Sequence, residues 1–180
     1  MHRTALRIAA ASLALAPAVA SAHPGHDGAS LVSGFMHPLG GVDHIIAMVA
    51  VGLLAARLGG RALWLVPASF VATMAAAGLA GMAGAGLPYV ETGIAVSVVV
   101  LGAIAIFRLA MPVAAAMGLV AFFAVFHGYA HGAEMPEMAA GLAYGAGFIV
   151  ATAMLHGIGI GLGLMVGQFS GVSSAPRRAD

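Results

Sequence analysis

Long apolar segments that contain almost no charged residue constrain the fold of this 180-residue chain most strongly. A helix needs about 20 mostly apolar residues to cross the core of a bilayer, and five segments approach or exceed that length. The sequence therefore predicts an all-α, polytopic helical membrane bundle with about five transmembrane helices. A six-helix version would split the last segment or count the short apolar stretch 31–36. The five expected spans are 42–56, 63–82, 90–107, 112–126 and 138–166.

The composition excludes soluble classes of protein. Hydrophobic residues make up 62% of the chain and charged residues 7%, whereas a soluble domain carries about 25% charged residues. A net charge of +1 without any lysine cannot neutralise a run of phosphates, so we expect no nucleic-acid partner. The sequence also has no phosphate-binding Gly-x4-Gly-Lys motif, so we expect no nucleotide. Cysteine is absent, and any metal site must therefore use the eight histidines, carboxylates and methionines.

Residues 1–22 are typical of a cleavable signal peptide, with two arginines, a short apolar stretch and an Ala-Ser-Ala cleavage pattern. The alternative is an uncleaved first helix. Cleavage would leave a mature N-terminus beginning at His23, where His26 lies close by and could help to collect metal ions. The expected division is a signal peptide 1–22, a short periplasmic His-rich N-terminus 23–30, a transmembrane domain 31–168 and a cytoplasmic tail 169–180.

The arginines indicate the orientation of the bundle. Arg57 and Arg61 fall between the first two expected spans, Arg108 between the third and fourth, and Arg177 and Arg178 in the tail. All five are cytoplasmic if the mature N-terminus is periplasmic, as the positive-inside rule prefers. This pattern requires an odd number of spans and predicts a multi-pass protein of the bacterial inner membrane.

The first polar cluster within the apolar region contains His37, Asp43 and His44. Ionisable residues inside a membrane are rare and usually functional. Pro38 and two glycines lie within the same eight residues, and a broken helix at membrane depth is typical of a binding site. The alternative is structural, with Asp43 capping a helix and His44 packed in the core. We expect metal ligands here.

The second polar cluster contains His127, His131 and Glu134. The histidines are four residues apart and the glutamate follows three residues later, so a continuing helix places all three on one face. This spacing allows one helix to offer two imidazoles to a single ion. Glu91 is expected at the same outer end of the bundle, as a further ligand or as a solvated loop acid. His156 lies deeper and is either a transit ligand or a packing residue.

Both clusters resemble the motifs of the HupE/UreJ family of nickel permeases. The first reads His37-Pro38-Leu39-Gly40-Gly41-Val42-Asp43-His44 and continues through Met48 to Val51-Gly52. The second reads Phe126-His127-Gly128-Tyr129-Ala130-His131-Gly132-Ala133-Glu134. The resemblance implies uptake of Ni²⁺ for a nickel enzyme such as hydrogenase or urease, without choosing between these two.

The leading hypothesis is therefore a secondary transporter, and not an enzyme, that takes up a divalent transition metal. Imidazole with carboxylate suits Ni²⁺, with Co²⁺ or Zn²⁺ also acceptable, and we expect no prosthetic group. The partners would be the metal ion and the lipid bilayer, and a homo-oligomer is left open. One alternative is an intramembrane zinc hydrolase that uses His127, His131 and Glu134. Another is a haem cytochrome with two histidine ligands. The expected metal ligands are His37, Asp43, His44, Glu91, His127, His131 and Glu134, followed by His23, His26 and His156.

Overall fold

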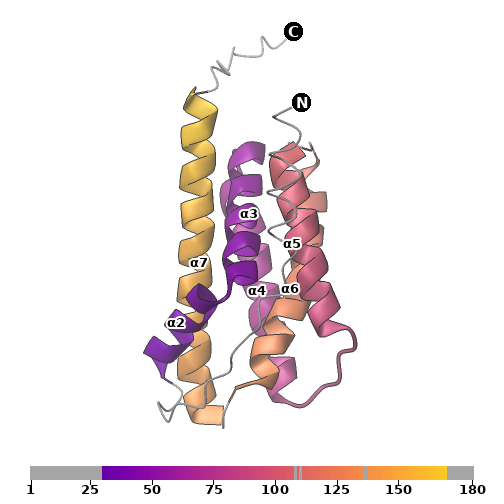
Figure 1. Ribbon diagram of the computed structural model, residues 1–180, viewed down its shortest axis with the longest axis vertical. Coiled ribbons are helices and arrows are strands. Elements are labelled where there is room, and N and C mark those ends of the chain that lie inside the picture. The colour runs from indigo at the N-terminus through magenta and orange to yellow at the C-terminus, as the bar shows by residue number, and fades with distance from the viewer. Residues whose placement is uncertain (1–29, 108, 110, 136–137, 170–180) are drawn as a thin grey trace.

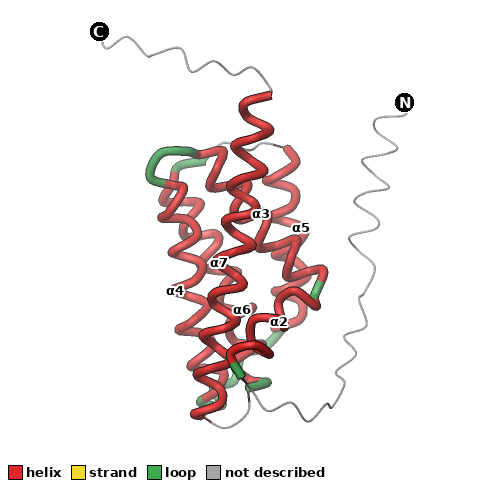
Figure 2. The backbone as a smooth tube through the Cα atoms, turned by 90° about the vertical axis from the view of Figure 1, so that its left-hand side faces the viewer, coloured by secondary structure: helices red, strands yellow, loops and turns green. Residues whose placement is uncertain are grey.

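Six helices make up nearly all of the part of the chain that the structure, a computed structural model, describes: residues 30–107, 109, 111–135 and 138–169. No strand occurs among these residues. Figure 1 shows the long helices running side by side, and Figure 2 shows the short helix α2 lying across one end of the bundle. The helices are α2 (Leu31–Gly40), α3 (Val42–Leu58), α4 (Ala62–Met82), α5 (Val90–Phe107), α6 (Val113–Ala133) and α7 (Met138–Phe169).

Four helices are long and apolar enough to cross a membrane individually: α4, α5, α6 and α7. The fifth candidate span is the pair α2 and α3, which meet at an angle of 88°. The prediction of an all-helical bundle with about five spans is confirmed, with its first span broken. The chain is thus a multi-pass membrane protein. Because α7 is one continuous helix, the six-helix version that splits the last segment is wrong.

The break between α2 and α3 follows from the local sequence. Ser30 caps α2 by accepting a hydrogen bond from the amide of Ser33, and the Ser33 hydroxyl accepts one from the amide of Ser30 in return. Pro38 lies in the last turn of α2, and Gly41 is extended between the two helices. Proline removes a backbone donor and so weakens the last turn of the helix, while glycine terminates helices readily. The short stretch that the sequence indicated is thus a complete ten-residue helix.

Glycines bring pairs of helices into backbone contact, as their four-residue spacing predicts. On α6, a Cβ atom at Gly128 or Gly132 would overlap the backbone of Met74 or Gly78 in α4. On α7, a Cβ at Gly159 would overlap the backbone of Val49 in α3. Gly157 and Gly161 are also four residues apart, but a Cβ at either position would meet no atom within 4 Å.

The half of the bundle next to the turn between α3 and α4 is a close-packed apolar core. It contains Val51, Leu54, Val66, Leu101 and Val120, each at most 1% exposed. Beyond it, Arg57 donates hydrogen bonds to the carbonyls of Ile104 (2.9 Å) and Ala105 at the C-terminal end of α5, where a cation is favoured. The opposite half, where α2 lies, carries the histidines.

The expected signal peptide 1–22 and most of the expected segments 23–30 and 169–180 lie outside the described residues, as do His23 and His26. Arg108 and both arginines of the tail lie outside them too. The cleavage, the domain boundaries and the orientation therefore stay predictions.

Candidate metal centre

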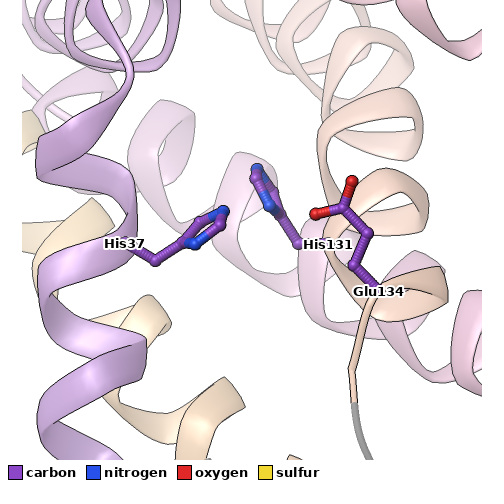
Figure 3. A group of neighbouring side chains, drawn as sticks. All are labelled: His37, His131 and Glu134. Carbon is purple, nitrogen blue, oxygen red and sulfur yellow. The ribbon is translucent and has the colours of Figure 1, made fainter. Parts of the chain in front are cut away.

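Three potential metal ligands from different parts of the chain meet where α2 lies against α6. His37 is in the last turn of α2, His131 is in the last turn of α6, and Glu134 directly follows α6. Each residue offers one ligand atom, and these atoms all lie within 4.8 Å of one another. Figure 3 shows the His37 ring and the Glu134 carboxylate on either side of His131. We call these three residues the outer group.

The spacing of the outer group suits a single ion after a small adjustment. Ligand atoms bound to one Ni²⁺ or Zn²⁺ ion at about 2.1 Å lie about 3–3.5 Å apart. His37 and Glu134 are exposed, and His131 is half-buried. Small rotations of the exposed side chains can therefore close the group around an ion that arrives from solvent.

Two buried histidines continue the series of imidazoles into the bundle. The ring of His44 lies with its centroid 5.3 Å from that of His131 and 5.2 Å from that of His127. The exposed fractions of His44 and His127 are 4% and 1%. His37, whose ring centroid is 4.9 Å from that of His131, begins the series. Both histidines of α6 thus face the same neighbour, as their spacing predicts.

Several ring nitrogens in this series have no hydrogen-bond partner. They are Nε2 of His44, Nδ1 of His127 and Nδ1 of His131, all buried. A buried polar group without a partner costs about 1–3 kcal/mol, and such groups in native proteins usually bind water or an ion. Three such nitrogens along one series of rings are potential ligands for a cation.

Ser97 of α5 contacts His127. The Ser97 hydroxyl oxygen lies 2.6 Å from the carbonyl oxygen of Ile94 and 2.8 Å from Nε2 of His127. When the hydroxyl proton goes to Ile94, Nε2 of His127 donates to Ser97. That tautomer leaves the lone pair of a potential ligand on Nδ1 of His127, which has no hydrogen-bond partner. Ser97 was not among the residues expected from the sequence, although it is a lone serine within the apolar segment 94–107.

Aromatic side chains of α7 lie against the imidazoles. These residues, Tyr144 and Phe148, were not among those expected from the sequence. The ring of Phe148 in α7 lies 4.3 Å from that of His131 and 5.0 Å from that of His44. Tyr144, one turn earlier, lies 5.6 Å from His37. A cavity of about 290 Å³ between α4, α6 and α7 is lined by His131, Phe148, Met74 and apolar neighbours. Tyr144 and Phe148 are four residues apart, and this spacing is the sequence pattern that could have indicated that both face the same side of the helix.

The structure does not bring Asp43 or Glu91 into the outer group. Both are exposed near the ends of their helices, and the Asp43 carboxylate turns back toward Gly41. His156 is buried farther along α7. Of the seven leading candidates, the structure thus gathers His37, His44, His127, His131 and Glu134.

Comparison with known proteins shows the family of the chain. The family model described as HupE / UreJ protein matches residues 11–177, nearly the whole chain. The chain belongs to the HupE/UreJ family. It is 47% identical over 152 residues to Protein HupE of Rhizobium leguminosarum bv. viciae, covering 84% of this chain and 79% of that protein. No solved structure matches.

Membership of the HupE/UreJ family confirms the resemblance found in the two His-containing motifs. It supports a metal transporter that spans the membrane several times, and it is consistent with a protein that is not an enzyme. The matched range 11–177 contains all the described helices and the three positions of the outer group.

Proposed function

We propose that this HupE/UreJ protein is a secondary transporter that takes up a divalent transition metal, most specifically Ni²⁺, across the bacterial inner membrane. The observation that carries the proposal is the outer group, whose three ligand atoms lie within 4.8 Å of one another at the start of a series of buried imidazoles. Imidazole and carboxylate together suit Ni²⁺, Co²⁺ and Zn²⁺ better than Ca²⁺ or Cu⁺.

The outer group would capture the hydrated ion from the periplasm, with Glu134 supplying negative charge and His37 and His131 replacing water. Asp43 and Glu91 would attract cations electrostatically to the same end, and the mature N-terminus with His23 and His26 would collect them first. His44 and His127 would then accept the ion within the bundle. A membrane potential of 100 mV, negative inside, would contribute about 4.6 kcal/mol for a divalent cation.

The delivered ion would serve a nickel enzyme such as hydrogenase or urease. We place the mature N-terminus in the periplasm and the C-terminus in the cytoplasm, because Arg57 and Arg61 then lie on the cytoplasmic side. The zinc hydrolase alternative has less support because the ligand atoms that converge within 4.8 Å belong to His37, His131 and Glu134, and not to His127. Phe70, which lies between His127 and His156, argues against a haem held by these two histidines.

Transport can be tested with ⁶³Ni²⁺ in nickel-starved cells that express the chain, beside an Asp43→Asn/His44→Ala double variant of equal membrane abundance. We expect accumulation by the parent and at least about a tenfold lower rate in the double variant, because it loses an imidazole and a carboxylate. Excess unlabelled Co²⁺ and Zn²⁺ would measure selectivity. Binding without accumulation by either protein would contradict the proposal.

Ser97→Ala is expected to weaken Ni²⁺ binding by about 10–100-fold, the usual effect of losing a group that orients a histidine ligand. The expected cause is loss of the tautomer that leaves Nδ1 of His127 unprotonated. Titration calorimetry on the purified protein would measure the affinity. Ser97→Thr keeps the hydroxyl and should restore most of it.

Ser69→Ala is the matched control for Ser97→Ala, because Ser69 also donates to a backbone carbonyl, that of Met117 in α6, at 3.1 Å. Ser69 makes no hydrogen bond with a histidine that the structure describes. An equal loss of affinity in both variants would show that Ser97 acts through general packing and not through His127.

A further inference from the structure

His156 lies deep in the bundle, separate from the outer group. Its side chain is 1% exposed, and neither ring nitrogen has a hydrogen-bond partner. A neutral imidazole has one donor and one acceptor, so both are left without a partner in a low-dielectric surrounding. This is an expensive arrangement, and in native proteins it usually marks a bound ion or water.

Two further polar or soft groups lie one helical turn away. Thr152 precedes His156 by four residues on α7 and is fully buried, and its hydroxyl lies 4.0 Å from the sulfur of Met74 in α4. Met74 follows Phe70 by four residues, and the Phe70 ring lies 5.3 Å from that of His156. One face of α4 thus lies against one face of α7, with the Thr152–Met74 contact one helical turn from the Phe70–His156 contact.

This inner cluster lies beyond the outer imidazoles along one face of α7. Phe148, Thr152 and His156 follow one another at four-residue intervals, so Phe148 and His156 are about 12 Å apart along the helix axis. Phe148 contacts His131 and His44. At the inner end, the Phe70 ring lies between His127, at 5.9 Å, and His156.

The cavity beside the outer group extends to one member of the inner cluster. Met74, Phe148 and His131 all line this cavity of about 290 Å³, whereas Thr152 and His156 do not. The cavity thus connects His131 with Met74.

We infer that His156, Thr152 and Met74 form a second, inner binding station for the divalent cation, with His156 as the main ligand. The inference rests on the proposed transport function. All three donors are neutral, so the inner station binds more weakly than the outer group with its carboxylate. Conduction requires such weak, successive sites, because an ion must also leave each of them. Imidazole with a thioether disfavours Mg²⁺ and Ca²⁺, which prefer oxygen ligands.

The test compares His156→Leu and His156→Gln with the parent in proteoliposomes loaded with a metal-sensitive dye, together with Ni²⁺ titration of each purified protein. We expect both variants to transport at least about tenfold more slowly, because successive sites are needed for conduction. The high-affinity binding event at the outer group should remain, and a second, weaker event present in the parent should disappear. Met154→Leu, an exposed change on the same turn of α7, is the control.

Each result separates the inference from the proposed function. A parent that neither binds nor transports Ni²⁺ would overturn the proposed function itself. A parent that transports, with both His156 variants equally fast and still binding two ions, would overturn the inner station alone. Misfolding is checked by the thermal midpoint of unfolding, which we expect not to fall in His156→Leu because that change removes an unpartnered polar group.

A spectroscopic comparison tests the thioether directly. X-ray absorption of the parent loaded with two equivalents of Ni²⁺ should show a sulfur neighbour that is absent from the isosteric variant Met74→Leu and from His156→Leu. The chain has no cysteine, so any sulfur ligand must be a methionine. A sulfur signal that survives Met74→Leu, or no sulfur signal in the parent, would remove Met74 from the station.

Discussion

Replacing His131 with alanine is expected to abolish nickel uptake and to lower the affinity for Ni²⁺ by more than about 100-fold. Groups that merely orient a metal ligand contribute about 10–100-fold in affinity, and His131 is proposed as a ligand itself. It also connects the two parts of the site, because its ring lies beside His37 on the outer side and His44 on the inner side. Its loss would remove a ligand and interrupt the series.

The measurement is ⁶³Ni²⁺ uptake together with thermal unfolding of the purified protein with and without Ni²⁺. A ligand at about 100 times its dissociation constant stabilises the folded state by about 2.7 kcal/mol, and His131→Ala should lose this stabilisation. Its metal-free stability should change little, because Nδ1 of His131 has no partner. Tyr129→Phe on the same helix is the control. Normal uptake by His131→Ala would remove His131 from the path.

The helices could be predicted from the sequence because the length of each apolar segment, and the polar residues that separate the segments, determine where a chain can cross a membrane. The fourth expected span, 112–126, is shorter than α6, which continues to Ala133, as the helix expected to carry His127 and His131 on one face requires. The apolar span ends earlier because the added residues include His127 and His131. They stay helical because Gly128 and Gly132 pack against the backbone of α4.

The candidate residues could be named from the sequence, but their grouping could not. His37 meets His131 only because the chain bends by 88° between α2 and α3, and no local pattern specifies the direction of that bend. Asp43 and His44 were both expected to be metal ligands. Although they are adjacent in sequence, His44 is buried and Asp43 is exposed. Ser97 contacts His127 from a different helix, and only the packing of α5 against α6 brings the two residues together.

Helix packing and the site are coupled through α6, and Gly132→Ala is expected to disrupt both. A Cβ atom at Gly132 would overlap the backbone of Gly78 in α4, and a backbone cannot rotate away as a side chain can. We expect the free energy of unfolding to fall by about 3 kcal/mol, the upper part of the range for overpacking. Uptake should fall as well, because α6 carries His131 next to Gly132 and must shift.

Two other glycines make this expectation specific. Gly118 is on the same helix and a Cβ there meets nothing within 4 Å, while a Cβ at Gly78 meets only the Gly128 carbonyl oxygen at 3.4 Å, an ordinary contact. Gly118→Ala and Gly78→Ala should therefore change stability by less than about 1 kcal/mol. Denaturant unfolding in detergent would compare all three variants. Equal losses of stability in Gly78→Ala and Gly132→Ala would contradict the close approach of α6 to α4, because of these three glycines only Gly132 lacks room for a methyl group.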